Sequence, residues 1–160
     1  MAEDIDVKST ARPPVRIASP AGATGIAFAA LVPLGLALIV VAIDGIGGLT
    51  AETAGTAFIA YAALLLTFFA GARFGHALRA AGVTVAAAAT ALPVIVALAS
   101  LYLPDRIAAG ILAVAYAGQG AWDVWSADRA QLAAWYGRLR LRTTPIAVLL
   151  LIAGVFVLGS

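Results

Sequence analysis

Long runs of apolar residues, separated by short polar breaks, extend through most of the chain. The clearest runs cover residues 22–43, 53–72 and 80–104, and none of them contains Asp, Glu, Lys or Arg. A helix needs about 20 apolar residues to cross the hydrocarbon core of a bilayer. These runs therefore predict membrane-spanning helices.

Two weaker segments complete the pattern. The run from Ile107 ends at Asp123, so we expect this span to continue through Trp125, with Asp123 facing protein at headgroup depth. The last run begins at Thr144-Pro145, a pair typical of a helix N-cap and first helical position. The predicted spans are about 22–43, 53–73, 83–103, 107–125 and 144–159. The sequence thus predicts an all-α integral membrane bundle of five transmembrane helices.

The segment over about residues 127–142 has a different character. Leu132, Trp135, Tyr136 and Leu139 recur at helical spacing, and the arginines lie largely off this stripe. The pattern favours an amphipathic helix in the membrane interface before the last span. A polar extension of that span, forming one long helix, is the alternative. The predicted interfacial residues are Trp135, Tyr136, Arg138, Arg140 and Arg142.

The distribution of basic residues predicts an orientation. Residues 1–21 form a polar, proline-containing tail without apolar periodicity, ahead of a transmembrane domain over 22–160. With five spans, every Lys and Arg except Arg106 falls on one side. Basic loops favour the cytoplasm. We therefore expect a multi-pass protein of the bacterial cytoplasmic (inner) membrane, with a cytoplasmic N-terminus and a periplasmic C-terminus.

Composition agrees with a lipid environment. Only 11% of residues are charged and 63% are hydrophobic, whereas soluble domains carry about 25% charged residues. The net charge of +2 gives no reason to expect a nucleic-acid partner. The absence of cysteine and the single histidine leave no cysteine or histidine cluster for a metal, so we expect no metal and no cofactor.

Polar groups inside the apolar runs are the candidate site. Arg73 ends the second run, and we expect it to contact either Asp123 or a lipid phosphate. Exchanging the charges of the Arg73–Asp123 pair should then partly rescue either single change. Tyr116, Gln119 and Asp123 share one face of the fourth span. They form either an interhelical hydrogen-bond network, which we favour, or the wall of a polar pocket.

Two glycines flank this arginine. Gly71 and Gly75 have the spacing that lets membrane helices approach closely, which predicts packing within the bundle. No arrangement of nucleophile, base and orienting group is visible in the sequence, nor a glycine-rich phosphate loop. We therefore do not expect an enzyme.

Three blocks of residues resemble a known family. They are Ala30-Leu31-Val32-Pro33-Leu34, Phe69-Ala70-Gly71-Ala72-Arg73-Phe74-Gly75 and Ala134-Trp135-Tyr136-Gly137-Arg138-Leu139-Arg140. In order and spacing they are similar to blocks of the transmembrane-protein-69-like family, although Phe74 replaces that family's tryptophan. Gln119 and Asp123 resemble its polar pair. The resemblance implies a compact multi-span helical protein of bacterial or mitochondrial inner membranes and carries no biochemical activity.

Two function classes follow from these features. The first is a non-enzymatic structural or accessory protein, with the lipid bilayer and other membrane-protein subunits as partners. The second is a small transporter or carrier with a polar pocket near Arg73, Gln119 and Asp123. An open, water-accessible pocket would favour transport. A dry bundle with Arg73 and Asp123 locked together would favour the structural role.

Overall fold

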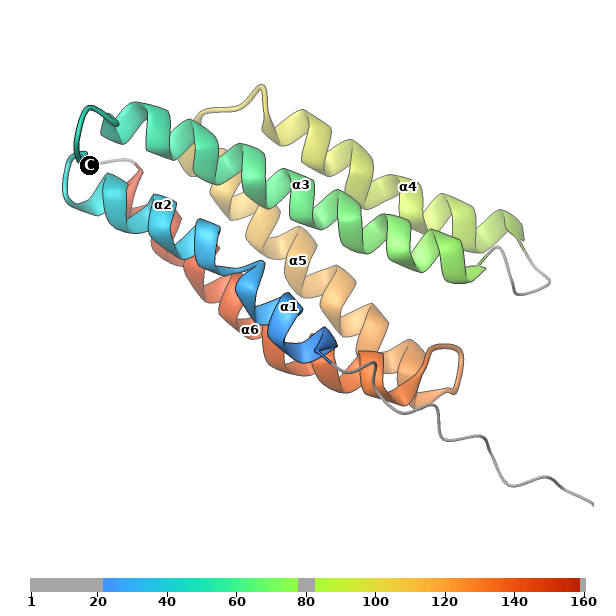
Figure 1. Cartoon of the computed structure of the whole chain (residues 1–160). Coiled ribbons are helices and arrows are strands. Elements are labelled where there is room, and N and C mark those ends of the chain that lie inside the picture. The colour runs from blue at the N-terminus through green and yellow to red at the C-terminus, as the bar shows by residue number, and fades with distance from the viewer. Residues whose placement is uncertain (1–21, 78–82, 159–160) are drawn as a thin grey trace, which may run out of the picture.

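The computed structural model describes residues 22–77 and 83–158, and within these ranges its regular elements are helices. They are α1 (Ala23–Ala29), α2 (Val32–Ala42), α3 (Ala51–Ala77), α4 (Val83–Ser100), α5 (Asp105–Asp128) and α6 (Ala134–Val157). Figure 1 shows them side by side along one long axis, with α1 and α2 following each other in one line. The centre of the bundle is formed by fully buried side chains from α2, α3, α5 and α6, namely Leu34, Phe58, Leu66, Leu112 and Leu151.

Four helical segments are long and apolar enough to cross a membrane, which indicates a multi-pass membrane protein. They are Ala23–Ala42, Ala51–His76, Asp105–Asp128 and Ala134–Val157. The predicted third span corresponds to α4, of which the apolar segment Thr90–Ser100 is shorter than a span. The predicted tail over residues 1–21 lies outside the described residues, as do Arg79 and residues 159–160.

The first span is interrupted beside Pro33, as expected for a proline in a membrane helix. Helix α1 ends at Ala29, and α2 begins two residues beyond the junction residue Ala30 with a proline in its first turn. The Tyr61 hydroxyl donates a hydrogen bond of 2.9 Å to the Ala30 carbonyl. The break in the first span is therefore fixed by α3.

A tight turn joins α2 to α3 at the end of the bundle away from α1. Asp44, Gly45, Gly47 and Gly48 all have positive φ. A Cβ at Gly45 would also lie 2.7 Å from the Leu49 carbonyl oxygen, so this position requires glycine on two grounds. Such a turn brings α3 directly back along α2.

The prediction of a separate interfacial helix over about 127–142 is wrong. Helix α5 extends to Asp128, and α6 starts at Ala134 and continues through Pro145 to Val157. Thr144 and Pro145 therefore lie inside a helix and not at its start. The last span is the long helix that the sequence offered as the alternative.

Burial on α6 explains this difference. One face of α6 is buried at alternating spacings of three and four residues, at Gly137, Arg140, Thr144, Ala147, Leu151 and Gly154. A matching face of α5 is buried at Ala109, Leu112, Tyr116, Gln119, Asp123 and Ser126. Such paired faces pack as in a coiled coil. The polar first turns of α6 therefore pack against α5 and do not form a separate helix in the membrane interface.

Glycines allow close helix contacts, but not at the predicted positions. A Cβ at Gly120 would lie 2.5 Å from Thr144 Oγ1, and one at Gly154 would lie 2.8 Å from the Phe58 ring. Nothing lies within 4 Å of a Cβ placed at Gly71 or Gly75. The prediction of close packing at Gly71 and Gly75 is wrong because both face outward.

Candidate functional site

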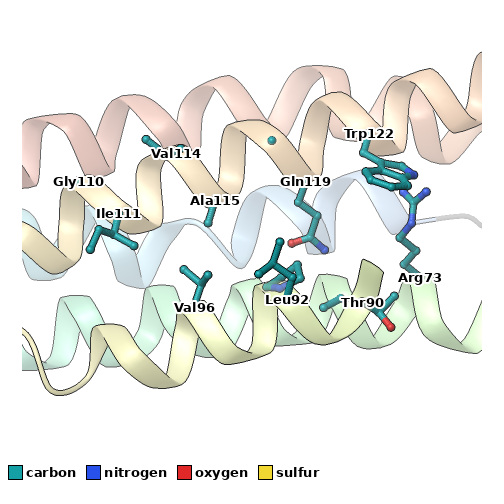
Figure 2. Close-up of a pocket in the computed structure, with 13 residues that line it drawn as sticks. Arg73, Thr90, Leu92, Val96, Gly110, Ile111, Val114, Ala115, Gln119 and Trp122 are labelled. Atoms are coloured by element: carbon teal, nitrogen blue, oxygen red, sulfur yellow. The ribbon is translucent and has the colours of Figure 1, made fainter. Parts of the chain in front are cut away.

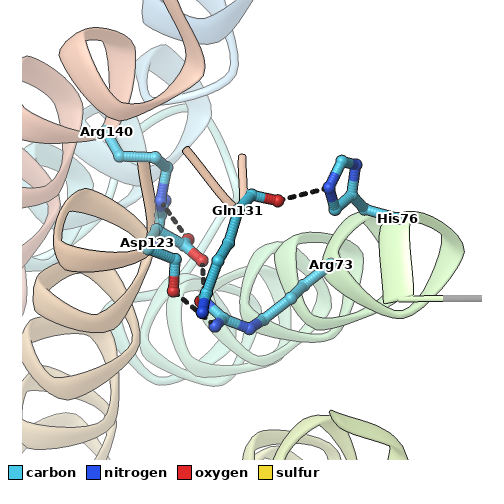
Figure 3. Close-up of polar contacts among 6 residues, drawn as sticks. Arg73, His76, Asp123, Gln131 and Arg140 are labelled. Atoms are coloured by element: carbon cyan, nitrogen blue, oxygen red, sulfur yellow. Dashed lines mark hydrogen bonds and ion pairs between the residues drawn. The ribbon is translucent and has the colours of Figure 1, made fainter. Parts of the chain in front are cut away.

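Asp123 lies at the centre of a three-helix ionic cluster, which we call the arginine clamp (Arg73, Asp123, Arg140). The Asp123 side chain is fully buried. Arg73 Nη1 of α3 donates to Asp123 Oδ1 at 2.7 Å, and Arg140 Nε of α6 donates to Oδ2 at 2.9 Å. Figure 3 shows the two guanidinium groups reaching the carboxylate from opposite sides. Of the two contacts that the sequence left open for Arg73, with Asp123 or with a lipid phosphate, the structure has the one with Asp123.

The prediction that Arg140 is an interfacial residue is wrong. Its side chain is only 1% exposed, and its guanidinium carbon lies 4.0 Å from the centre of the Phe69 ring. Contact with an aromatic face is a favourable environment for a desolvated guanidinium. Arg140 is therefore an internal residue that joins α6 to α3 and α5.

Arg73 makes further contacts on its side of the clamp. Its Nη2 donates to Ser126 Oγ at 2.8 Å, and its guanidinium lies 4.9 Å from the centre of the Trp122 ring. One turn further along α3, the His76 ring is hydrogen-bonded to the backbone carbonyl of Gln131 in the α5–α6 turn. The C-terminal end of α3 is thus attached to α5 through Arg73 and to the α5–α6 turn through His76.

Clamp geometry determines what Asp123 can do chemically. Removing a carboxylate from water is costly unless paired charges and hydrogen bonds compensate. Both oxygens of Asp123 accept a hydrogen bond from an arginine, so the carboxylate is engaged on both sides. Such a group is well placed to fix three helices relative to one another. It is poorly placed to act as a proton acceptor for a substrate.

Tyr116 and Gln119 share the Asp123 face of α5, as predicted, but have different surroundings. The Tyr116 hydroxyl donates to the Ala62 carbonyl of α3 at 2.9 Å, which fits the predicted interhelical network. Gln119 is buried, with only 7% of its surface exposed. Neither its Oε1 nor its Nε2 has a hydrogen-bond partner among the described residues.

Gln119 lies in the wall of a groove formed by α3, α4 and α5, with a volume of about 650 Å³. Most of the lining is apolar, including Leu92, Val96, Ile111 and Val114. Figure 2 shows the Gln119 amide directed from α5 toward α4, with Arg73 and Trp122 at one end of the groove. Asp123 does not line the groove. The polar pocket predicted from three residues is therefore divided, with Gln119 in the groove, Asp123 in the clamp and Arg73 in both.

The other predicted interfacial residues lie at the start of α6. Trp135 and Tyr136 are partly buried, with ring centres 5.9 Å apart in an edge-to-face arrangement. Arg138 and Arg142 are exposed. These two arginines can reach the bilayer surface, whereas Arg140 between them cannot.

Acidic residues gather at the opposite end of the bundle. Asp44, Glu52 and Asp105 line a hollow of about 550 Å³ where the ends of α2, α3, α5 and α6 meet. Among the described residues, no three His, Cys, Asp or Glu side chains are grouped closely enough to hold a metal ion. This end therefore offers no candidate metal centre.

Reasoning from the sequence missed the internal role of Arg140, although a signal was present. Gly137, Thr144, Ala147, Leu151 and Gly154 recur with it at spacings of three and four residues. Small residues on such a repeat indicate a buried helix face in membranes. An arginine on that face requires an internal counter-ion, and Asp123 was available.

Comparison with known proteins gives one match. A family model described as "Protein of unknown function (DUF3429)" matches residues 19–156. No curated protein matches the chain, and no solved structure matches it.

Proposed function

Because the chain belongs to the DUF3429 family of proteins of unknown function, we propose its role from its geometry. We propose that the protein is a non-enzymatic structural or accessory protein of a larger membrane complex. The arginine clamp is the observation that carries this proposal. One buried carboxylate on α5 pairs with an arginine from α3 and an arginine from α6, an arrangement that favours a rigid bundle in which Asp123 is engaged on both sides.

The proposed topology has five spans, with α4 as the third. Its 18 residues correspond to about 27 Å of helix at about 1.5 Å per residue, close to the hydrocarbon thickness of about 30 Å. Among the described arginines, Arg73, Arg129, Arg138, Arg140 and Arg142 belong to one end of the bundle, and Arg106 belongs to the other. The positive-inside rule places that end in the cytoplasm of a bacterial inner membrane. The transmembrane-protein-69-like resemblance supports the same location.

A small transporter or carrier is the second candidate, and one observation favours it. Gln119 and Arg73 both line the groove of about 650 Å³. The apolar character of the remaining lining argues against a path for a hydrated solute. Asp123, the third residue of the predicted pocket, is occupied by the clamp.

Purification from native membranes tests the accessory role. The tagged protein is extracted in a mild detergent, separated by size exclusion and analysed by quantitative mass spectrometry. We expect the same membrane proteins to co-elute in fixed stoichiometry, and a tagged membrane protein of similar size but unrelated sequence serves as control. Elution of the chain by itself, in several mild detergents, contradicts the accessory role.

The variant Gln119→Leu separates the two candidates. An accessory protein should keep its partners in this variant, because Gln119 faces the groove between helices of its own bundle. For a carrier, the same change should abolish the physiological effect of the protein in cells while leaving its assembly unchanged. Loss of that effect with normal assembly would therefore overturn the accessory proposal.

A further inference from the structure

The unpartnered Gln119 amide indicates that the groove between α4 and α5 has a ligand. A buried amide without hydrogen bonds is costly, and in lipid there is no water at hand to satisfy it. Gln119 offers Nε2 as a donor and Oε1 as an acceptor at the wall of an otherwise apolar space. Its natural partner is a polar group attached to an apolar body.

The dimensions of the groove match one leaflet of a bilayer. Its lining follows α5 from Gly110 to Trp122, which is about 18 Å of helix. Half of the hydrocarbon core is about 15 Å. The groove also opens sideways, since Leu92 is 63% exposed and Val114 is 75% exposed. A lipid chain can therefore enter from the membrane, parallel to the helices.

Polarity increases toward one end of the groove. Gly110, Ile111 and Val114 line the apolar end, Gln119 follows, and Trp122 and Arg73 lie at the other end. The clamp has two arginines against one carboxylate, so it carries a net positive charge. Arg73 is 15% exposed, and its two hydrogen bonds use two of the five guanidinium N–H groups. It can still bind an anion.

We infer that this groove is a binding site for one membrane phospholipid. One acyl chain lies along Gly110–Gly118, the ester carbonyl accepts a hydrogen bond from Gln119 Nε2, and the phosphate binds the Arg73 guanidinium beside Trp122. This order of groups from Gly110 to Trp122 is the order in a phospholipid from chain to headgroup. The inference requires only the membrane location of the chain and does not depend on the accessory role.

Lipid titration followed by native mass spectrometry tests the site. The protein is purified in a phosphate-free non-ionic detergent, depleted of lipid, and titrated with phosphatidylglycerol, phosphatidylethanolamine or diacylglycerol. We expect one phospholipid per chain, bound at least about tenfold more tightly than diacylglycerol, which lacks the phosphate. Inorganic phosphate should not compete, because it lacks the acyl chain.

Two glycines provide a matched pair of variants. A Cβ at Gly118 or at Gly35 meets nothing within 4 Å, so both positions accept a larger side chain. Gly118 lines the groove and Gly35, on α2, does not. Gly118→Leu should weaken phospholipid binding at least about tenfold, and Gly35→Leu should leave it unchanged.

A second pair of variants tests the amide. Gln119→Leu should weaken phospholipid binding by about two- to tenfold, the worth of one hydrogen bond. Gln131→Leu makes the same change at an exposed position outside the groove and should have no effect. Equal binding of diacylglycerol and phospholipid would overturn the inference. Unchanged phospholipid binding in Gly118→Leu would also overturn it. So would a Gly118→Leu variant that changes the self-association of the protein and not its phospholipid binding.

Discussion

Gly120 of α5 lies so close to Thr144 of α6 that a Cβ at position 120 would be 2.5 Å from Thr144 Oγ1. Gly118, two residues earlier, faces open space. We expect Gly120→Ala to destabilise the bundle by about 1–3 kcal/mol, because the added methyl group overpacks the interface. The measurement is unfolding by SDS in mixed micelles. Gly118→Ala is the control and should be neutral or slightly stabilising. Equal effects would show that the α5–α6 contact is looser than described.

Neutralising Asp123 should destabilise the protein strongly. Asp123→Asn leaves Arg140, which is 1% exposed, without a counter-ion, and breaking a buried ion pair costs about 3–5 kcal/mol. Asp128→Asn removes an exposed carboxylate from the same helix and should change stability little. The comparison is again the SDS midpoint, and similar midpoints for the two variants would contradict the clamp.

Arg140 also changes the outcome expected for a charge exchange. The sequence by itself suggests that Arg73→Asp combined with Asp123→Arg restores the pair. With Arg140 Nε 2.9 Å from the present carboxylate, an arginine at position 123 would face a second buried cation. We therefore expect the double variant to be more stable than Asp123→Arg, which groups three cations, but clearly less stable than the unmodified protein. Full rescue by the exchange would mean that Arg140 does not contact position 123 in the membrane.

Replacing the guanidinium group of Arg140 with the ammonium group of a lysine should destabilise the protein. Arg140 binds Asp123 through Nε while its planar head lies against Phe69. Lysine has no equivalent fork and stacks less well. We expect Arg140→Lys to lower the free energy of unfolding by about 2 kcal/mol, the scale of a desolvated cation–π contact. Arg142→Lys, at an exposed position, is the control, and stability equal to that control would argue against the stacking.

Tyr116 offers a milder test of the contact between α5 and α3. Its hydroxyl donates to a helical carbonyl, that of Ala62. Tyr116→Phe should cost about 1 kcal/mol, the usual net worth of one hydrogen bond. Tyr102→Phe removes the hydroxyl from a side chain that is 83% exposed and should cost nothing. Equal thermal midpoints for the two variants would exclude the Ala62 bond.

Cysteine labelling tests the orientation, since the chain has no native cysteine. Ile46→Cys lies in the α2–α3 turn and Gln131→Cys in the α5–α6 turn, at opposite ends of the bundle. In intact spheroplasts, a membrane-impermeant maleimide should label Ile46→Cys. It should label Gln131→Cys only after the membrane is opened. The reverse pattern would invert the topology.

Much of the fold follows from the sequence because span length and charge are local properties. Uncharged runs located the helices apart from the start of α6, and Asp123 was one of the two contacts expected for Arg73. These inferences need only the thickness of the bilayer and the high energy of an unpaired charge in it.

The start of α6 and the groove could not be obtained in this way. A stripe of Trp135 and Tyr136 beside arginines has the same appearance on an interfacial helix and on the polar end of a long span. The two cases differ in whether the segment packs against a matching face of α5, and that packing is a contact between residues distant in the sequence. The groove likewise depends on how α4 lies against α5, which the composition of neither helix determines.

The position of the clamp along the chain has a consequence for biogenesis. Asp123 is synthesised before Arg140, and only a short turn separates α5 from α6. If α6 entered the bilayer by itself, it would bring an unpaired arginine into lipid, at a cost of up to about 3 kcal/mol. As a helical hairpin with α5 it carries its own counter-ion. We therefore expect the insertion machinery to release the last two helices into lipid together, as one neutralised pair.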